Sequence, residues 1–391
     1  MMRYDVVILG AGAAGMMAAI EAGRRGRRVL VIDHAKAVGE KIRISGGGRC
    51  NFTNLDIRPD CFLSQNPRFA LSALKRFTQW DFIARVDAAG IRWHEKTLGQ
   101  LFCDGSAREI LAMLQSQMKE CGVTIWLETE IRHVGQAAPF RVETSRGAVE
   151  ALAMIVATGG KSIPKMGATG LGYHIAESYG LPLTETRPAL VPLTLAAQVL
   201  EPLQALSGTA VQGRANCGRQ GFEEAILFTH RGLSGPAILQ ISSYWREGDS
   251  LRLDLARGED LGEALRRLRQ SEGRIALRTA LARFLPEKLA RHLEEISGLR
   301  GNLADQNNAR IDQLAALVHS FEITPVGSEG YRTAEVTLGG VNTDALDART
   351  MQAKSVPGLH FVGEVVDVTG WLGGYNLQWA WSSGWAAGQA V

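Results

Sequence analysis

At 391 residues the chain is long for one compact domain, and its length favours two or three. Its 46% hydrophobic and 21% charged residues suit a globular protein, and a net charge of +3 is far below that of a dedicated nucleic-acid binder. Five scattered cysteines without a CxxC pair argue against a disulfide framework and against a metal site. A strand pattern begins by Asp5 and no apolar run is long enough to span a bilayer, so we expect a cytoplasmic protein without signal peptide or membrane span.

The chain opens with one strand–helix–strand unit. Val6–Leu9 is a continuous apolar run with β-branched residues, which is typical of a short buried strand. A glycine-rich loop follows, and small apolar residues over Ala13–Arg25 predict a helix. Val29–Ile32 is a second buried strand, closed by Asp33, so the first third of a Rossmann-type sheet is expected here.

Further along, residues 66–121 are predicted to be mostly helical. Apolar residues recur at helical spacing in three segments, Ala70–Lys75, Asp81–Ala89 and Ala107–Cys121. A strand at Val123–Leu127 and a hairpin formed by Phe140–Thr144 with Val149–Ala157 are expected to follow.

The texture of the sequence changes after Pro188. Short β-like runs over 189–257 and a β-like part over 316–336, with a strand at Glu322–Val336, flank a strongly helical, Arg-rich stretch at 258–315. We therefore predict that 189–336 is an insert with a β-barrel-like part and a helical part. Residues 337–391 return to a glycine-rich loop, a strand at Gly358–Val362, a loop and a helix, so the first domain is expected to comprise 1–188 and 337–391.

The loop after the first strand carries the GxGxxG pattern in its required context. Gly10 permits the tight turn, Gly12 lets the backbone approach a pyrophosphate, and Gly15 allows close packing of helix on strand. Ala13 and Ala14 begin the helix whose N-terminus faces the phosphates. Asp33 stands where a carboxylate can accept hydrogen bonds from a ribose. This motif alone leaves NAD and FAD open.

A second glycine cluster favours FAD. Basic and polar residues surround three consecutive glycines soon after the second strand, as a long dinucleotide needs near its middle: Lys41, Ser45, Gly46, Gly47, Gly48, Arg49, Cys50 and Asn51. The alternative is a flexible loop with solvated cations. Ala157, Thr158 and Gly159 end a later strand at the expected exit from the nucleotide domain. The predicted cofactor-binding set also includes His34 and Ile131.

The C-terminal region completes the pattern. Gly363 and Glu364 end a strand, and such an acid typically reaches ribose or ribityl hydroxyls in flavin domains. Gly373 and Gly374 then precede a helix whose first residues are Tyr375, Asn376 and Leu377. The N–H groups of that helix N-terminus can face the flavin N1/C2=O edge, where negative charge accumulates on reduction. The order of these elements along the chain predicts FAD.

The sequence resembles the BaiN/YhiN-type flavoproteins, described as NAD(P)/FAD-dependent or aminoacetone-oxidase-like oxidoreductases. The resemblance covers essentially the whole chain and rests on Gly-Ala-Gly-Ala-Ala-Gly at 10–15, Ser-Gly-Gly-Gly-Arg-Cys-Asn-Phe-Thr-Asn at 45–54 and Gly-Gly-Tyr-Asn-Leu-Gln-Trp-Ala at 373–380. Leu-Phe-Thr-His at 227–230 and Val-Thr-Leu-Gly-Gly-Val at 336–341 add to it. It implies an α/β protein with a glutathione-reductase-like Rossmann FAD domain interrupted by a β-barrel-like plus helical insert. Gly-Gln-Leu-Phe-Cys at 99–103 departs from the Gly-Arg-x-Phe-Pro of many relatives. A role assigned to that Arg in the relatives therefore cannot be carried over to this chain.

Candidates for catalysis are few. His230 and Arg231 follow a short strand of the insert and are candidates for a proton donor and an anion clamp. The alternative is a structural turn in which Thr229 and Ser234 bond the backbone and Pro236 begins a helix. Tyr375 is a third candidate. Cys50 has no partner cysteine nearby, and a lone cysteine is more often a buried hydrophobe.

Three functions remain open from the sequence. The first is an FAD-dependent oxidoreductase that transfers hydride through flavin N5 between a small organic substrate and NAD(P)H or O₂; no second dinucleotide domain is evident, so a nicotinamide would bind transiently. The second is an FAD-binding, RNA-associated protein of the tRNA-modification type. Arg and Lys alternate with Asp and Glu over 250–315, which favours a solvated face and no nucleic-acid partner. The third is a flavin-binding regulator without turnover.

Overall fold

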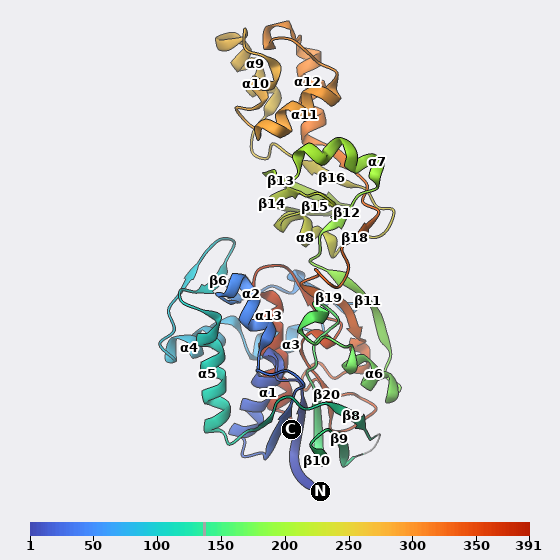
Figure 1. Ribbon diagram of the computed structural model, residues 1–391. Coiled ribbons are helices and arrows are strands. Elements are labelled where there is room, and N and C mark those ends of the chain that lie inside the picture. The colour runs from blue at the N-terminus through green and yellow to red at the C-terminus, as the bar shows by residue number, and fades with distance from the viewer. Residues whose placement is uncertain (136–137) are drawn as a thin grey trace. The chain divides into compact units, whose positions relative to one another are not determined.

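The computed structural model describes residues 1–135 and 138–391, which form two compact units (Figure 1). We call Met1–Arg187 with Val336–Val391 the Rossmann unit, and Pro188–Glu335 the insert unit. The chain leaves the Rossmann unit once and returns to it once.

The Rossmann unit is built on a seven-stranded sheet in the order β7-β2-β1-β10-β9-β8, in which β20 also pairs with β10. Five strands are parallel: β7 (Thr124–Trp126), β2 (Val29–Ile32), β1 (Met2–Leu9), β10 (Gly147–Val156) and β20 (Leu359–Phe361). β9 (Phe140–Thr144) and β8 (Ile131–Val134) are antiparallel additions. The predicted strands of this sheet are confirmed, because continuous apolar runs suit parallel strands that are buried on both faces.

The strand order of this sheet reverses between β1 and β10. From β1 the chain moves to β2 and β7 on one side, whereas β10 and β20 lie on the other. The carboxyl ends of the two central strands meet, with Leu9 opposite Val156. Ligands of open α/β sheets bind in the crevice at such a switch point. The fold therefore places a nucleotide crevice where the GxGxxG loop leaves β1.

Helices pack against this sheet and each other (Figure 1). They are α1 (Ala13–Arg24), α2 (Glu40–Gly48), α3 (Leu71–Arg76), α4 (Gln79–Ala88), α5 (Ala107–Glu120), α6 (Leu171–Ser178) and α13 (Tyr375–Gly388). Capping boxes begin α4 at Thr78 and α5 at Ser106, because each is followed three residues later by an acid. The helices predicted over 66–121 agree with α3, α4 and α5 to within two residues at each end.

α13 explains the apolar C-terminus of the chain. Nearly all of the helix is buried, and its polar residues are satisfied internally: Gln378 Nε2 and Ser382 Oγ both donate to the carbonyl of Phe77. Across the described residues we find no helix with the length and apolar character needed to cross a membrane.

Three smaller sheets complete the Rossmann unit. β3 (Asn51–Asn54), β6 (Gln100–Cys103) and β5 (Trp93–Glu95) form one, β11 (Leu183–Ala189) pairs with β19 (Val336–Val341), and β4 (Phe62–Leu63) pairs with β21 (Thr369–Gly370). The sequence did not predict the β3-β6-β5 sheet. Its strands have three or four residues each and show no long alternation, so the hydrophobic period carries no signal there.

The insert unit contains a seven-stranded sheet in the order β17-β16-β13-β14-β15-β12-β18. The strands are β12 (Leu193–Thr194), β13 (Ala210–Cys217), β14 (Gln220–Phe228), β15 (Gly232–Ser234), β16 (Leu251–Asp254), β17 (Phe321–Ile323) and β18 (Gly327–Ser328). Within the described residues no ladder joins the edge strands β17 and β18, so the sheet is open. The single strand expected over 322–336 is wrong: it is two short strands and a turn, and Val336 begins β19 of the Rossmann unit.

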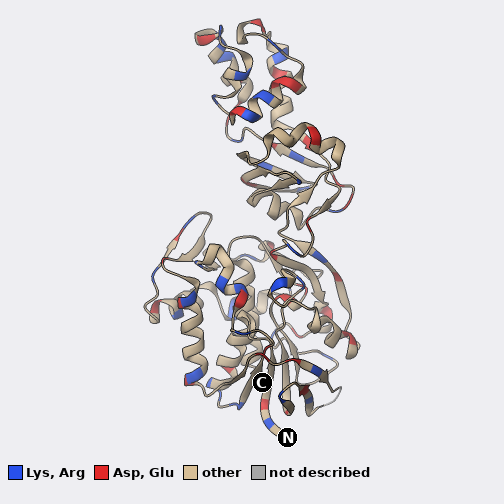
Figure 2. Cartoon of the chain, in the orientation of Figure 1, with Lys and Arg blue, Asp and Glu red and all other residues tan. Residues whose placement is uncertain are grey.

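Helices accompany this sheet. α7 (Ala197–Leu200) and α8 (Pro236–Ser242) are short, and the predicted helical stretch consists of α9 (Leu261–Glu272), α10 (Leu277–Leu281), α11 (Glu287–Ser297) and α12 (Asn308–His319). Leu265, Leu293 and Leu314 are buried between these helices. Figure 2 shows basic and acidic residues interleaved on their outer faces, as the sequence indicated. This stretch carries no single-signed stripe.

Candidate FAD site

The glycines of the fingerprint loop are required by close backbone contacts. Gly10 has φ +108°, and a Cβ there would lie 2.4 Å from the carbonyl oxygen of Ala157 at the end of β10. A Cβ on Gly15 would lie 2.0 Å from the carbonyl oxygen of Gly10. Gly12 differs, because nothing in the protein lies within 4 Å of its Cβ position. Gly10 and Gly15 therefore shape the loop, and Gly12 faces the space a ligand would occupy.

The N-terminus of α1 is open to an anion. Gly12 is its N-cap residue and provides no side-chain cap, and no acidic residue stands in the first turn, where Ala13 and Ala14 lie. The N–H groups of the first turn can therefore donate to a pyrophosphate, and the positive end of the helix dipole stabilises its negative charge.

Asp33 organises the adenosine end of the crevice. Its carboxylate accepts hydrogen bonds from the N–H of Ala11 at 2.6 Å and of Ala35 at 2.8 Å. Its carbonyl accepts from the N–H of Thr129, which brings the start of β8 and hence Ile131 to this side of the sheet. The ring of His34 is more than half exposed and lies 3.5 Å from the Asp33 carboxylate. A carboxylate has lone pairs beyond these two bonds, so Asp33 can also accept from a ribose hydroxyl.

A polar atom at the switch point lacks a partner. Thr158 follows Ala157 at the carboxyl end of β10, and its Oγ1 is buried without a hydrogen-bond partner among the described residues. An unsatisfied buried hydroxyl costs about 1–3 kcal/mol, so such groups call for a ligand or water. The backbone of Thr158 lies beside Gly10 of the fingerprint loop, whereas its Oγ1 lies against Gly172 in α6.

The second glycine cluster is not the simple loop that the sequence predicted. Residues 40–44 are helical, and the helix is broken at Ser45, with Gly46, Gly47 and Gly48 all at positive φ. Ser45 Oγ donates to the carbonyl of Ile42 at 2.8 Å. The prediction missed the helical start because three glycines lower helix propensity over the whole window. Arg49 is exposed next to Gly46–Gly48, while Asn51 begins β3.

Lys41 and Glu364 form the polar centre of the site. Lys41 Nζ donates to Glu364 Oε2 at 2.7 Å and to Ser162 Oγ at 2.6 Å. Glu364 Oε1 accepts from Ser162 Oγ at 2.8 Å and from the N–H of Thr337 at 2.9 Å. Both carboxylate oxygens are thus engaged by the protein. The carboxylate of Glu364 ties four segments together at the switch point, and sequence reasoning missed its partners Ser162 and Thr337.

The start of α13 is held rigidly and left uncapped. Asn54 Nδ2 donates to the carbonyl of Gly373 at 2.9 Å, and Asn376 exchanges two hydrogen bonds of 2.8 Å with the backbone of Gly370. Gly374 is the N-cap residue and provides no side-chain hydrogen bond to the first turn, Tyr375 to Leu377. The fold fixes the direction of the N–H groups there, and they can donate hydrogen bonds to the negative edge of a flavin. Gly363, which precedes Glu364, is tied to the same helix by the hydroxyl of Ser383.

Cys50 and Tyr375 are buried. Cys50 has no exposed surface, and burial raises the pKa of its thiol to about 12, so the reactive thiolate is not populated at neutral pH. Tyr375 packs edge-on against Phe62 and Trp371, and burial raises the pKa of its hydroxyl. The side chain of Tyr375 thereby anchors the first turn of α13.

His230 and Arg231 belong to the insert unit. They form the exposed tip of the turn between β14 and β15, and Thr229 Oγ1 accepts from the N–H of Arg231 at 3.2 Å and of Gly232 at 3.1 Å. Pro236 is in the first turn of α8. The structure thus contains the Thr229 turn, and the catalytic role of His230 and Arg231 stays a prediction. The residues of the FAD site described above lie in the Rossmann unit.

A crevice with these properties fits FAD: it has an uncapped helix N-terminus for the pyrophosphate, an acid for the ribose and a second uncapped helix N-terminus for the flavin. The model of the HI0933-like protein Rossmann domain matches residues 4–390. The chain belongs to the HI0933-like family. Its members are flavoproteins, and the chain is a flavin-dependent oxidoreductase with FAD on a Rossmann fold.

Relatives match along their whole length. A protein of Escherichia coli (strain K12) named ribosomal RNA dihydrouridine synthase is 50% identical over 100% of this chain and 98% of its own. The 3-dehydro-bile acid delta(4,6)-reductase of Clostridium scindens is 29% identical over 98% of each chain. Among solved structures, the 3-ketosteroid-delta4-(5alpha)-dehydrogenase of Rhodococcus jostii RHA1 has a TM-score of 0.50 at 16% identity, covering 99% of this chain and 97% of its own, which shows a shared fold.

Proposed function

We propose that this protein is an FAD-dependent reductase that converts uridine of ribosomal RNA to dihydrouridine. The observation that carries the proposal is the 50% identity, over the full length of both chains, to the E. coli ribosomal RNA dihydrouridine synthase. The proposal takes up the RNA-associated alternative of the sequence analysis, with ribosomal RNA in place of tRNA. It places the protein in the cytoplasm, with NAD(P)H as the electron donor.

The chemistry of the two named relatives supports a reductase. Dihydrouridine differs from uridine by two hydrogens added across a C=C bond conjugated to a carbonyl, and a delta(4,6)-reductase also acts on C=C bonds. When bound, FAD that NAD(P)H has reduced would supply the hydride, and the second hydrogen would arrive as a proton. A site that can donate to the flavin edge, as the first turn of α13 can, stabilises the negative charge that accumulates there.

The residues of the crevice have distinct tasks in this proposal. The fingerprint loop and the N-terminus of α1 would hold the pyrophosphate, and Asp33 would hold a ribose. Lys41, Ser162 and Glu364 would keep the surrounding segments in place, because their hydrogen bonds join parts of the chain that are far apart in sequence. None of them needs to take part in proton transfer.

The decisive experiment offers unmodified ribosomal RNA to the FAD-loaded protein. Ribosomal RNA transcribed in vitro is incubated anaerobically with NADH or NADPH, and nucleosides are then analysed by mass spectrometry. We expect dihydrouridine at one or few sites, and none when the nicotinamide is left out. Flavin reduction without any dihydrouridine in the RNA would contradict the proposal.

A second candidate is reduction of a small conjugated enone, which the 29% identity to the bile acid reductase favours. It retains the small organic substrate expected from the sequence. The same assay separates the two candidates when a 4,6-dien-3-one steroid replaces the RNA. Turnover of the steroid with no product from the RNA would favour this second function.

A further inference from the structure

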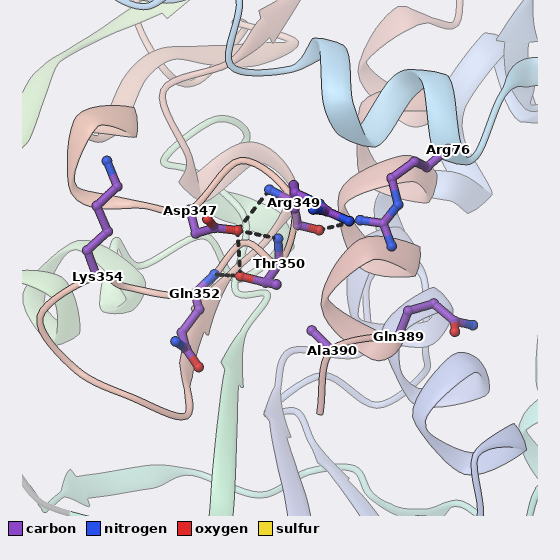
Figure 3. A pocket seen from close by; sticks show the side chains of 8 residues that line it. All are labelled: Arg76, Asp347, Arg349, Thr350, Gln352, Lys354, Gln389 and Ala390. Atoms are coloured by element: carbon purple, nitrogen blue, oxygen red, sulfur yellow. Dashed lines mark hydrogen bonds between the residues drawn. The ribbon is translucent and has the colours of Figure 1, made fainter.

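A surface pocket of the Rossmann unit lies away from the FAD crevice (Figure 3). It is lined by three cations, one carboxylate and four uncharged residues: Arg76, Arg349, Lys354, Asp347, Thr350, Gln352, Gln389 and Ala390. Its volume of about 550 Å³ is larger than that of one phosphate group, so a sugar or a second phosphate can bind next to a first phosphate. The pocket combines residues from the ends of α3 and α13 and from the segment between β19 and β20.

The single carboxylate of this pocket is already used by its own loop. Asp347 Oδ1 accepts from the N–H of Arg349 at 3.0 Å, from the N–H of Thr350 at 2.9 Å and from the Thr350 hydroxyl at 2.9 Å (Figure 3). These hydrogen bonds stabilise the turn, and they occupy Oδ1 of the Asp347 carboxylate with donors from that turn. Against the effect of burial, hydrogen bonds from Thr350 and Arg349 and the positive charge of Arg349 lower the pKa of the Asp347 carboxyl, so this carboxylate offsets part of the charge of Arg349.

Two of the pocket's three cations are bonded to backbone carbonyls. Arg76 donates to the carbonyl of Arg349 at 2.6 Å and its guanidinium lies 4.9 Å from the centre of the Trp385 ring, so its position is set by packing. Lys354 donates to the carbonyl of Asp344 at 2.9 Å. In the part of the chain that the structure describes, none of the three forms an ion pair. Such a group of positive charges in one pocket suits a phosphate.

We propose that this pocket binds a backbone phosphate of the RNA substrate, an inference that rests on the proposed function. Gln389 marks the carboxyl end of α13, and the flavin-facing residues lie at its other end. At 1.5 Å per residue a helix of 14 residues spans about 20 Å. A single base cannot reach both places, whereas a polynucleotide can. The pocket thus favours RNA over a small enone, because a steroid has no phosphate to place there.

The test removes two charges and leaves Arg76 in place, because that side chain also packs on Trp385. Binding of in vitro transcribed ribosomal RNA is measured against salt concentration for the wild type and for the double variant Arg349→Gln, Lys354→Gln. We expect the dissociation constant to rise about tenfold at low salt and the salt slope to fall by about 1. FAD content and melting temperature establish that the variant is folded.

A control variant has the same loss of charge elsewhere. Arg108 and Lys119 are exposed on α5, and their double replacement by Gln is expected to leave the RNA affinity within about twofold. Lys354→Arg in the background of wild-type Arg349 is expected to keep the salt slope, because the charge stays. If the wild type binds RNA and the pocket variant binds it with unchanged slope and affinity, the inference is overturned.

Inorganic phosphate distinguishes an RNA contact from a site for a free phosphate ester. Phosphate is titrated into both proteins and detected by ³¹P line broadening. Broadening by the wild type but not by the pocket variant is expected. If this result comes with no RNA binding by the wild type, the proposed function and the RNA source are both overturned. If the wild type binds RNA but phosphate shows no difference between the proteins, the pocket is not an anion site.

Discussion

Two glycines of one loop, Gly10 and Gly12, have different roles. The first is enclosed by the backbone of Ala157 and has a positive φ, so it is required for the fold. The second has φ −79°, which any residue adopts, and its missing side chain leaves open space. The same motif thus contains one glycine that the fold requires and one that leaves space for a ligand.

This contrast predicts opposite effects of the same substitution. Gly10→Ala is expected to lower stability by about 1–3 kcal/mol and to abolish FAD binding, because its Cβ would overlap the Ala157 carbonyl. Gly12→Ala is expected to leave the melting temperature of the apoprotein unchanged and to weaken FAD binding. Thermal unfolding without FAD and flavin absorbance after reconstitution measure the two effects. A Gly12→Ala protein that binds FAD normally would show that no phosphate approaches this residue.

At the scale of elements, the packing of α1 against α13 joins the two ends of the chain. A Cβ on Gly384 would lie 2.4 Å from the carbonyl oxygen of Ala14, and one on Gly388 would lie 2.7 Å from that of Ala18. The helices approach so closely because both positions lack side chains, four residues apart on one face of α13. Because Ala14 meets Gly384 and Ala18 meets Gly388, the two helices run parallel, and the first turn of α13 extends past the N-terminus of α1.

Gly384→Ala is therefore expected to destabilise the Rossmann unit by about 1–3 kcal/mol, through displacement of α13, and to release FAD at lower temperature. Gly262→Ala in α9 is a matched control, since its nearest neighbours lie at 3.5 Å. Alanine there removes backbone freedom of the unfolded chain, so it should be neutral or stabilising by up to about 1 kcal/mol. Melting curves followed by flavin fluorescence compare the two; equal melting temperatures would refute the packing argument.

At the scale of the whole molecule, the chain leaves the Rossmann unit and returns to it through two paired strands. β11 ends next to the insert, β19 follows it directly, and the two strands form one ladder in the Rossmann unit. Chain ends that are already adjacent can be joined by a short loop at a small entropic cost. The insert is thus separable from the fold that holds FAD.

Replacement of 188–335 by a short Gly/Ser linker is expected to leave a protein that binds FAD. We expect FAD binding to persist because the residues of the FAD site all lie outside the replaced segment. Loss of dihydrouridine formation with retained flavin would assign substrate contacts to the insert, where His230 and Arg231 lie. Absorbance at the flavin maximum and the RNA assay are the measurements. A truncated protein that is folded but colourless would contradict the independence of the Rossmann unit.

Local sequence determined much of this protein. The βαβ unit, the glycine fingerprint, the helices α3 to α5 and the uncapped start of α13 depend on residues close together in the chain, so periodicity, capping and turn residues predict them. The family resemblance follows from the same motifs. These features are sufficient to identify an FAD-binding Rossmann fold.

Tertiary structure alone decided how those parts meet. Lys41 and Glu364 are 323 residues apart, and the cationic pocket brings Arg76 to Arg349 and Lys354. No period or spacing in the sequence encodes such contacts, because they depend on strand order and on the approach of helices such as α1 and α13. The engagement of Glu364 by protein donors was missed for this reason. Sequence therefore specifies the cofactor, while the fold specifies which distant residues meet around it and on the surface.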